Sequence, residues 1–214
     1  MSALDPLVFS AADFAERARA RLSLELPAGA FDRPWPARGD HALNPDTHIP
    51  AKAAKPAAVL VPIIAREEGA TLLLTQRHSG MRKHAGQIAF PGGRIDPDDA
   101  DPVAAALREA HEEIALPHGC VTPLGYLDPY QTGTGYRIMP VVALVAPPFE
   151  LALCEAEVAE AFETPLDFLM DPRNHQVVQR KEDGRRFFAM PYGERYIWGA
   201  TAGMLRNLYE RLYL

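Results

Sequence analysis

The stretch that decides the fold of this 214-residue chain is GQIAFPGGRIDPDDADPVAAALREAHEEIAL, residues 86–116. A short apolar run ends in Pro-Gly-Gly, an Asp-rich loop follows, and the remainder has the periodicity of an amphipathic helix. Asp101 suits the N-cap and Pro102 the first helical position, while Pro117 stops the helix. We therefore predict a strand, a loop and a helix around which the other elements assemble.

The predicted helix has an apolar stripe and a neighbouring acidic face. The residues expected to pack on a sheet are Val103, Ala106, Leu107, Ala110 and Ile114. Glu109, Glu112 and Glu113 fall within roughly 100° of arc beside the stripe, and Arg108 flanks them. These carboxylates repel one another, and they lie toward the helix end at which the macrodipole disfavours anions. The face is therefore either a solvated acidic surface or a site for a hard divalent cation such as Mg2+ or Mn2+.

Composition narrows the function classes. The length predicts one domain with an added terminal segment, and the net charge of −6 without a Lys/Arg-dense run argues against a nucleic-acid binder. Two cysteines, Cys120 and Cys154, suggest neither a disulfide framework nor a zinc site. No signal peptide and no apolar run of membrane-spanning length is visible, so we expect a cytoplasmic protein without a membrane partner.

The chain divides near residue 56. Residues 1–56 are predicted to hold a helix over 10–24, capped by Ser10, and a Pro-rich extended segment that Trp35 could anchor. Residues 57–214 are predicted to form the main domain. It begins with two apolar runs, AAVLVPIIAR and TLLLTQR, which have the pattern of a β-hairpin. Pro62 within the first run predicts an edge strand or a bulge.

The second half of the chain alternates strands and helices. VTPLGYLDPY and RIMPVVALVA have strand patterns, and Asp183-Gly184 predicts a further hairpin. Residues 155–163 are predicted to form a short acidic helix, followed by a turn at 165–169. Residues 196–214 are predicted to form the last helix, which packs through Leu205, Leu208 and Leu212, with Trp198 in the core.

A basic loop, residues 77–87, precedes the central stretch. Arg77, Arg82, Lys83 and His84 gather in it, and arginine binds phosphate through a bidentate fork. A solvated basic loop explains the same composition, so both interpretations stay open at this point.

The pair Gly92-Gly93, followed by Arg108-Glu109-x-x-Glu112-Glu113, resembles the box of the Nudix hydrolases, which cleave diphosphate linkages. Two features depart from the usual box. Its loop is one residue longer and carries Asp96, Asp98 and Asp99 in place of a Glu, and Ala115 replaces the glycine that usually follows the helix. The first departure leaves the loop ligand open, and the second affects local geometry because Ala adopts a positive φ only at a cost.

The run LLTQRHSGMRKHAGQIAFPGG is similar to the motif upstream of the box in the Nudix coenzyme A pyrophosphatases. The matching residues are Leu73, Leu74, Thr75, Arg77, Arg82, Gly86, Phe90, Pro91, Gly92 and Gly93. His78 departs from the small residue usual at its position. The longer Asp-rich loop also looks like this subfamily, and the likeness extends from about residue 57 to the end of the chain.

The resemblance implies an α/β fold, an α/β/α sandwich around a mixed β-sheet. It implies hydrolysis of coenzyme A or a derivative to 3′,5′-ADP and 4′-phosphopantetheine with Mg2+ or Mn2+. A second possibility is another Nudix substrate, such as NADH or ADP-ribose, and a third is a non-catalytic Nudix-like binding module. A homodimer is also expected by family likeness.

The resemblance also implies roles for individual residues. Glu109 and Glu112 would form the catalytic group, with Arg108 holding the glutamates in place. The metal ligands would be Glu109 and Glu113, and Glu112 would share that role or orient water. The residues expected to contact substrate are Arg77, Arg82, Gln87, Gly92 and Gly93. Glu155, Glu157 and Glu160 are candidates for a general base, although each also suits a solvated helix face.

Overall fold

The computed structural model of the chain describes residues 9–31, 38–45, 54–80 and 86–214. Its helices are α1 (Ala11–Arg21), α2 (Pro102–Ile114), α3 (Leu166–Met170) and α4 (Ala200–Tyr213), with 3-10 turns η1 (Asp40–Ala42), η2 (His118–Cys120) and η3 (Pro172–Asn174). Its strands are β1 (Arg38–Gly39), β2 (Lys55–Ile64), β3 (Thr71–Arg77), β4 (Ile88–Ala89), β5 (Gly92–Arg94), β6 (Val121–Tyr126), β7 (Tyr130–Gln131), β8 (Tyr136–Val145), β9 (Val158–Pro165), β10 (Gln176–Gln179), β11 (Arg186–Tyr192) and β12 (Arg195–Trp198).

A nine-stranded mixed sheet forms the centre of the molecule. Its main path runs β1-β7-β8-β2-β3-β4, while β5, β6 and β9 pair with β2, β8 and β3. Strands β2 and β8 are parallel over their full lengths. Both are nearly continuous apolar runs because both of their faces are covered.

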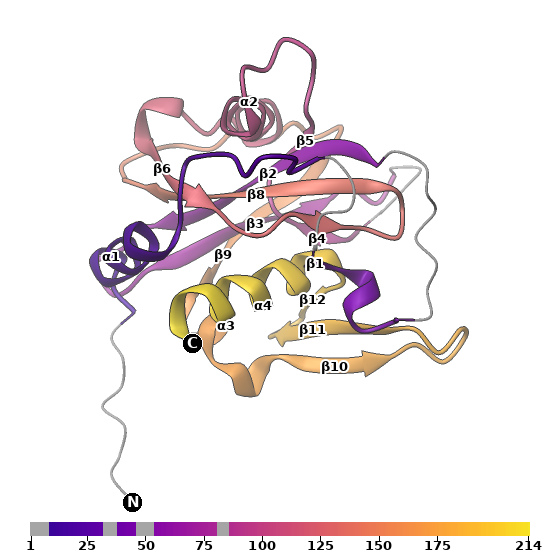
Figure 1. The fold of residues 1–214 in the computed structure, drawn as a ribbon. Coiled ribbons are helices and arrows are strands. Elements are labelled where there is room, and N and C mark those ends of the chain that lie inside the picture. The colour runs from indigo at the N-terminus through magenta and orange to yellow at the C-terminus, as the bar shows by residue number, and fades with distance from the viewer. Residues whose placement is uncertain (1–8, 32–37, 46–53, 81–85) are drawn as a thin grey trace, which may run out of the picture.

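Helices lie on both faces of this sheet (Figure 1), and each face carries a separate hydrophobic core. Helix α2 covers one face and buries Ala106, Ala110 and Ile114 against it, with Val103 and Leu107 partly buried beside them. Helices α1 and α4 cover the other face, where Phe14 of α1 and Leu205 of α4 are fully buried. The predicted α/β/α sandwich around a mixed sheet is confirmed. A second sheet, β10-β11-β12, lies beyond α4 (Figure 1).

Pro62 lies in the middle of the sheet, so the prediction of an edge strand is wrong. Its strand, β2, pairs with β8 on one side, and on the other it pairs first with β5 and then with β3. Pro62 falls between those two short ladders, which end at Val59 and begin at Ile63. A proline is tolerated there because neither ladder requires its missing N–H.

Residues 155–163 do not form the predicted acidic helix. From Val158 onward this segment is β9, which runs antiparallel to β3 with Phe162 opposite Leu74. Phe162 and Thr164 are buried two residues apart, the period of a strand, and a register shift opposite Gln76 and Arg77 places Val158 in the core on the other face. Pairing with β3 therefore overrides the helical propensity of the Ala and Glu residues in this segment.

The last helix begins later than predicted, at Ala200, because residues 195–198 form β12. Trp198 is half-buried on that strand rather than in the core, whereas Leu205, Leu208 and Leu212 are fully buried as predicted. The hairpins β2–β3 and β10–β11 and the helix capped by Ser10 are confirmed. Trp35 and Arg82 lie outside the described residues. Within the described part, no helix has the length and hydropathy needed to cross a bilayer.

Candidate active site

The central stretch folds into β4, β5, a loop and α2, as the sequence predicts. Asp101 caps the helix by accepting a hydrogen bond from the Ala104 N–H at 2.8 Å. The helix ends at Ala115, which adopts the left-handed conformation with φ 54° and ψ 30°. Ala115 therefore adopts the left-handed backbone conformation that a glycine usually adopts at this position. For an alanine this conformation costs about 1 kcal/mol of conformational free energy.

The two box glycines allow three elements to approach closely. Gly92 has a φ of 152°, and a Cβ there would lie 2.5 Å from the carbonyl oxygen of Ala58 on β2. A Cβ on Gly93 would lie 2.4 to 2.5 Å from the carboxylate atoms of Glu109. The absence of both side chains therefore brings β5 against β2 and leaves room beside β5 for the α2 carboxylate.

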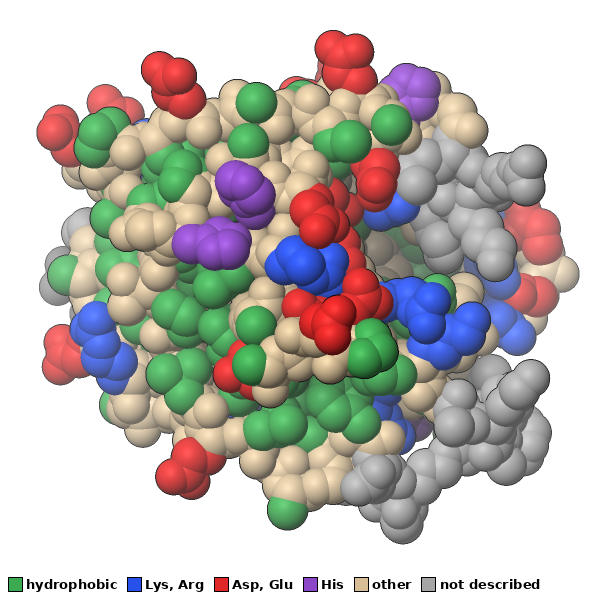
Figure 2. Space-filling model, turned by 90° about the horizontal axis from the view of Figure 1, so that it is seen from above, with side chains coloured by type: hydrophobic (Ala, Val, Ile, Leu, Met, Phe, Trp, Pro, Cys, Tyr) green, Lys and Arg blue, Asp and Glu red, His purple; other side chains and the backbone are tan. Residues whose placement is uncertain are grey.

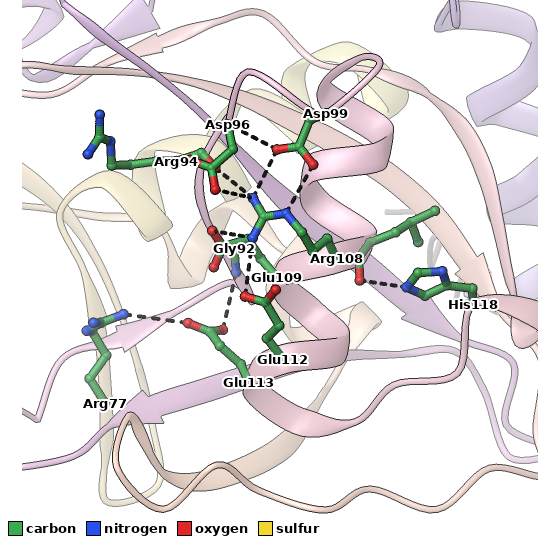
Figure 3. Close-up of polar contacts among 11 residues, drawn as sticks. Arg77, Gly92, Arg94, Asp96, Asp99, Arg108, Glu109, Glu112, Glu113 and His118 are labelled. Carbon is green, nitrogen blue, oxygen red and sulfur yellow. Dashed lines mark hydrogen bonds and ion pairs between the residues drawn. The ribbon is translucent and has the colours of Figure 1, made fainter.

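Arg108 organises the acidic loop and the helix face (Figure 3). Its Nε and Nη2 donate to the two carboxylate oxygens of Asp99 at 3.0 and 2.9 Å, and Nη2 also donates to the Arg94 carbonyl. Its Nη1 donates to Glu109 and Glu112, both at 3.2 Å. This network lowers the pKa of Asp99, chiefly through the hydrogen bonds from Arg108. Asp99 is thus the partner of Arg108, a pairing that the sequence left open.

Glu113 and Glu109 are the desolvated carboxylates of α2. The Glu113 residue is only 4% exposed, and burial raises its pKa to about 7. Its Oε2 accepts a hydrogen bond from the Gly92 N–H at 3.2 Å, which partly opposes this rise. Burial also raises the pKa of Glu109, against the opposing charge of Arg108. Glu112 differs because it is exposed, and its carboxylate faces Arg108.

Arg77 connects the upstream motif with the box (Figure 3). Its guanidinium Nη1 lies 3.7 Å from Oε1 of Glu113, and its backbone N–H donates to the Gln87 carbonyl at 3.0 Å. The end of β3 therefore stands beside the most deeply buried carboxylate of α2. Of the two arginines expected to contact substrate, Arg77 has a described position and Arg82 does not.

The three glutamates considered as bases occupy different places. The negative charge of Glu157 raises the pKa of both Glu109 and Glu113, so Glu157 lies within electrostatic range of the α2 carboxylates. Glu155 lines a separate cavity beside His78, and Glu160 forms an ion pair with Arg195. The sequence could not distinguish Glu157 because its proximity depends on the pairing of β9 with β3.

The carboxylates of α2 offer oxygen ligands, which are the ligands that hard cations such as Mg2+ prefer. Among the described side chains, no group of three His, Cys, Asp or Glu residues is placed to hold a metal. Mg2+, however, is commonly bound through one or two carboxylates, with substrate phosphates and water completing its shell. Glu109 and Glu113 meet that requirement. Burial disfavours their negative charges, and a cation between them would offset this cost. Glu112 is the exposed member of the three, and like Glu109 it accepts one hydrogen bond from Nη1 of Arg108.

The α2 side of the molecule concentrates charge around one hollow. Figure 2 shows Asp and Glu side chains gathered in the middle of this face, with Lys and Arg side chains beside them. Figure 3 places Glu109, Glu112 and Glu113 between Arg77 and Arg108. Carboxylates can hold a cation and activate water, while arginine can bind phosphate, so this arrangement suits the cleavage of a phosphate anhydride.

Comparison with known proteins agrees with this geometry. The NUDIX domain family model matches residues 54–182, which is more than half of the chain. The Nudix hydrolase NudL of Enterobacter sp. (strain 638) is 46% identical over 154 residues, covering 71% of this chain and 80% of that protein. NudL of Escherichia coli (strain K12) is 43% identical over 168 residues, covering 78% of this chain and 87% of that protein. Both relatives carry the description uncharacterized.

The Nudix hydrolase RenU of M. smegmatis has a related crystal structure. It is 22% identical, covers 73% of this chain and 84% of that one, and superposes with a TM-score of 0.51, which supports the fold. Nudix hydrolases act on pyrophosphate linkages and generally use divalent metal ions. The residue match, the two close relatives and the shared fold together show that this chain belongs to the Nudix hydrolases.

Proposed function

We propose that this Nudix hydrolase cleaves the diphosphate linkage of coenzyme A or a coenzyme A derivative. The products are 3′,5′-ADP and 4′-phosphopantetheine, and Mg2+ or Mn2+ is the cofactor. The observation that carries this proposal is the junction between the upstream LLTxR motif and the box. Arg77, which ends that motif, stands 3.7 Å from Glu113 of the box helix.

The α2 carboxylates and Arg108 have different proposed roles at the diphosphate. Glu109 and Glu113 would hold the cation, and Glu112 would share this role or orient water. The chemistry that a divalent cation would supply there is polarisation of the phosphoryl oxygens and neutralisation of the charge that develops on them. Arg108 is a positioning residue, since its bonds to Asp99, Glu109 and Glu112 fix the helix face.

The substrate contacts are assigned to residues upstream of the box helix. Arg77 would bind a phosphate of the diphosphate, and Arg82, which lies outside the described residues, is assigned a second phosphate, such as the 3′-phosphate of coenzyme A. Gln87, Gly92 and Gly93 contact the substrate through the strand edge that precedes the loop. This assignment draws support from the hydrogen bond between the Arg77 N–H and the Gln87 carbonyl, which ties both residues to one strand pair.

Glu157 is the general base in this proposal. Its charge acts on Glu109 and Glu113, whereas Glu160 is engaged with Arg195. The division of the chain into a terminal segment, 1–56, and a Nudix domain, 57–214, stays a prediction, as do the homodimer and the cytoplasmic location.

The test is a comparison of substrates by the full-length protein. We expect coenzyme A to give the highest kcat/KM among coenzyme A, NADH and ADP-ribose with Mg2+ or Mn2+, and mass spectrometry to identify 3′,5′-ADP and 4′-phosphopantetheine. EDTA should abolish the reaction. Faster cleavage of NADH or ADP-ribose would contradict the assignment to coenzyme A. Absence of metal-dependent hydrolysis across this set would favour a Nudix-like binding module.

A further inference from the structure

The small sheet ends in a strand whose outer edge is free. Its strand order is β10-β11-β12, so β10 has β11 on one side and no described strand on the other (Figure 1). The strand consists of Gln176, Val177, Val178 and Gln179, and Val177 is 52% exposed. An exposed strand edge of this kind can pair with a strand of another chain.

The backbone groups at this free edge belong to Val177 and Gln179. The Arg180 N–H donates to the Arg185 carbonyl at 2.8 Å, so the backbone groups of Arg180 face β11. Successive residues of an antiparallel strand alternate in direction, so Val178 also faces β11, whereas Val177 and Gln179 face away from it. Within the described part of the chain, no strand pairs with these two residues on their outer side. Two N–H donors and two carbonyl acceptors are therefore available there.

The strand lacks the features that usually protect an edge from association. Residues 176–179 include neither a charged residue nor a proline, and the two valines favour an extended backbone. Val178 lies on the same face of the small sheet as Phe187 and Trp198, whose ring centroids are 5.2 Å apart. All three side chains are only half-buried. An apolar stripe therefore runs across this face and ends at the free edge.

The edge is complementary to the same edge of a second copy. In an antiparallel pair with Val178 opposite Val178 of the second copy, each Val177 lies opposite a Gln179. Each of these two pairs exchanges two hydrogen bonds, so the ladder contains four. A register with Val177 opposite itself places Gln179 opposite His175, whose N–H already donates to the Pro172 carbonyl. The register centred on Val178 therefore satisfies the most backbone groups, and it places no like charges opposite one another within the strand.

From these observations we infer that the free edge of β10 is the interface of a homodimer. Three strands from each copy then form one six-stranded sheet, and the two apolar stripes meet at Val178 on the two-fold axis. The interface uses neither the box helix nor Arg77, so the inference does not depend on the proposed substrate. Because the paired strands are short, the interface belongs to the smallest size class and the dimer dissociates on dilution.

Sedimentation velocity of the full-length protein tests the dimer from low to high micromolar concentration. The wild type should shift from monomer to dimer. Val177→Pro removes an N–H that β11 does not use, so the variant should keep its circular dichroism spectrum. It should weaken the dimer about tenfold or more, because each dimer loses two hydrogen bonds.

Val177→Lys is a second variant, which keeps the N–H and introduces a charge at the edge. It should weaken the dimer as well, and it decides the result if Val177→Pro does not fold. Leu24→Lys is the matched control, since Leu24 is 53% exposed and lies outside the small sheet. It should leave the equilibrium unchanged.

A cysteine exchange tests the register. In the inferred dimer the two Val178 Cα atoms lie about 4.5 Å apart, within the range of a disulfide. Val178→Cys should therefore form a covalent dimer with oxidised glutathione on non-reducing gels, whereas Leu24→Cys and the wild type, with Cys120 and Cys154, should not. A wild type that stays monomeric at every concentration would overturn the inference. So would a dimer that the folded Val177 variants leave unchanged.

Discussion

The two ends of strand β3 each bring an arginine and a glutamate together, with opposite results. At the Thr71 end, Glu163 accepts hydrogen bonds from the Thr71 hydroxyl and from Arg66, whose Nε and Nη2 lie at 3.1 and 2.5 Å. At the Arg77 end, the guanidinium stays 3.7 Å from Glu113, beyond hydrogen-bonding distance.

The pKa values record this difference. Hydrogen bonds from Arg66 and Thr71 lower the pKa of Glu163, whereas burial raises that of Glu113 to about 7. Glu163 accepts hydrogen bonds from two side chains, which stabilises its charge, whereas the more deeply buried Glu113 has one hydrogen bond, from the Gly92 N–H, and its charge costs stability. Perturbed carboxylates of this kind cluster at functional sites, which supports our proposal that the Arg77 end of β3 is the functional end.

The largest effect should come from Glu113→Gln. If Glu113 is a metal ligand, as we propose, loss of its charge should lower kcat for coenzyme A on the order of 10³-fold at saturating Mg2+. The fold should not suffer, because a raised pKa means that the ionised form opposes folding above the ordinary value near 4.5. Chemical denaturation at pH 8 should therefore show a variant at least as stable as the wild type.

The control for this variant is Glu163→Gln, the same exchange at the other end of β3. It should retain wild-type kcat. An unchanged rate for Glu113→Gln, or an equal loss for the two variants, would contradict the distinction between the ends.

The next effect should come from Arg77→Ala. Loss of the charge-assisted phosphate contact that we propose for Arg77 should lower kcat/KM for coenzyme A by about 10- to 100-fold. Arg77→Lys should recover only part of the loss, because an ammonium cannot form the bidentate fork. Arg66→Ala, at the opposite end of β3, should leave kcat/KM unchanged. Steady-state kinetics of the three variants can measure these effects. Full activity of Arg77→Ala would contradict the assignment of Arg77 to substrate binding.

A smaller effect should be seen in the stability of Glu163→Gln. The pKa of Glu163 is lowered in the folded protein, so its contribution is present above about pH 4.5 and is lost as the pH falls through the folded value. We expect a loss of about 1 kcal/mol at pH 7, since Arg66 is partly exposed and its charge is screened. Urea titrations at pH 7 and pH 3.5 should show the difference from wild type shrinking at the lower pH.

The smallest effect should come from Ala115→Gly, which touches neither end of β3. Relief of the left-handed backbone should raise the free energy of unfolding by about 0.5–1 kcal/mol, less than the full strain because glycine also gains freedom in the unfolded chain. Differential scanning calorimetry can measure the rise, and Ala152→Gly, which has no positive φ, provides a comparison. A fall in melting temperature for Ala115→Gly would contradict the strain.

Much of the fold could be predicted because local chemistry and global packing agree. Asp101, Pro102 and the apolar stripe define α2 in both sequence and structure. The β2–β3 hairpin follows in the same way from its apolar runs and the polar turn between them. Glu109, Glu113 and Arg108 could be identified by their spacing, since one helix fixes their relative positions.

The predictions that were wrong concern segments whose structure depends on residues far away in the chain. Residues 158–165 contain good helix formers, yet pairing with β3 makes them a strand. Pro62 predicts an edge, yet a change of partner strand accommodates it in the centre. Trp198 was expected in the core, but β12 places it at a cavity wall. Each outcome depends on contacts between residues far apart in the chain, which local patterns do not contain.

The sequence by itself determined the box helix, its glutamates and the likeness to Nudix hydrolases, because these features lie within about thirty consecutive residues and helical geometry relates them. Only the tertiary structure decided that Asp99 accepts hydrogen bonds from Arg108 and that Glu157 acts electrostatically on Glu113. It also decided that the Arg77 guanidinium lies 3.7 Å from Glu113, beyond hydrogen-bonding distance. The physical reason is that burial and hydrogen bonding set the state of a carboxylate. Both depend on which distant strands and loops come to surround it.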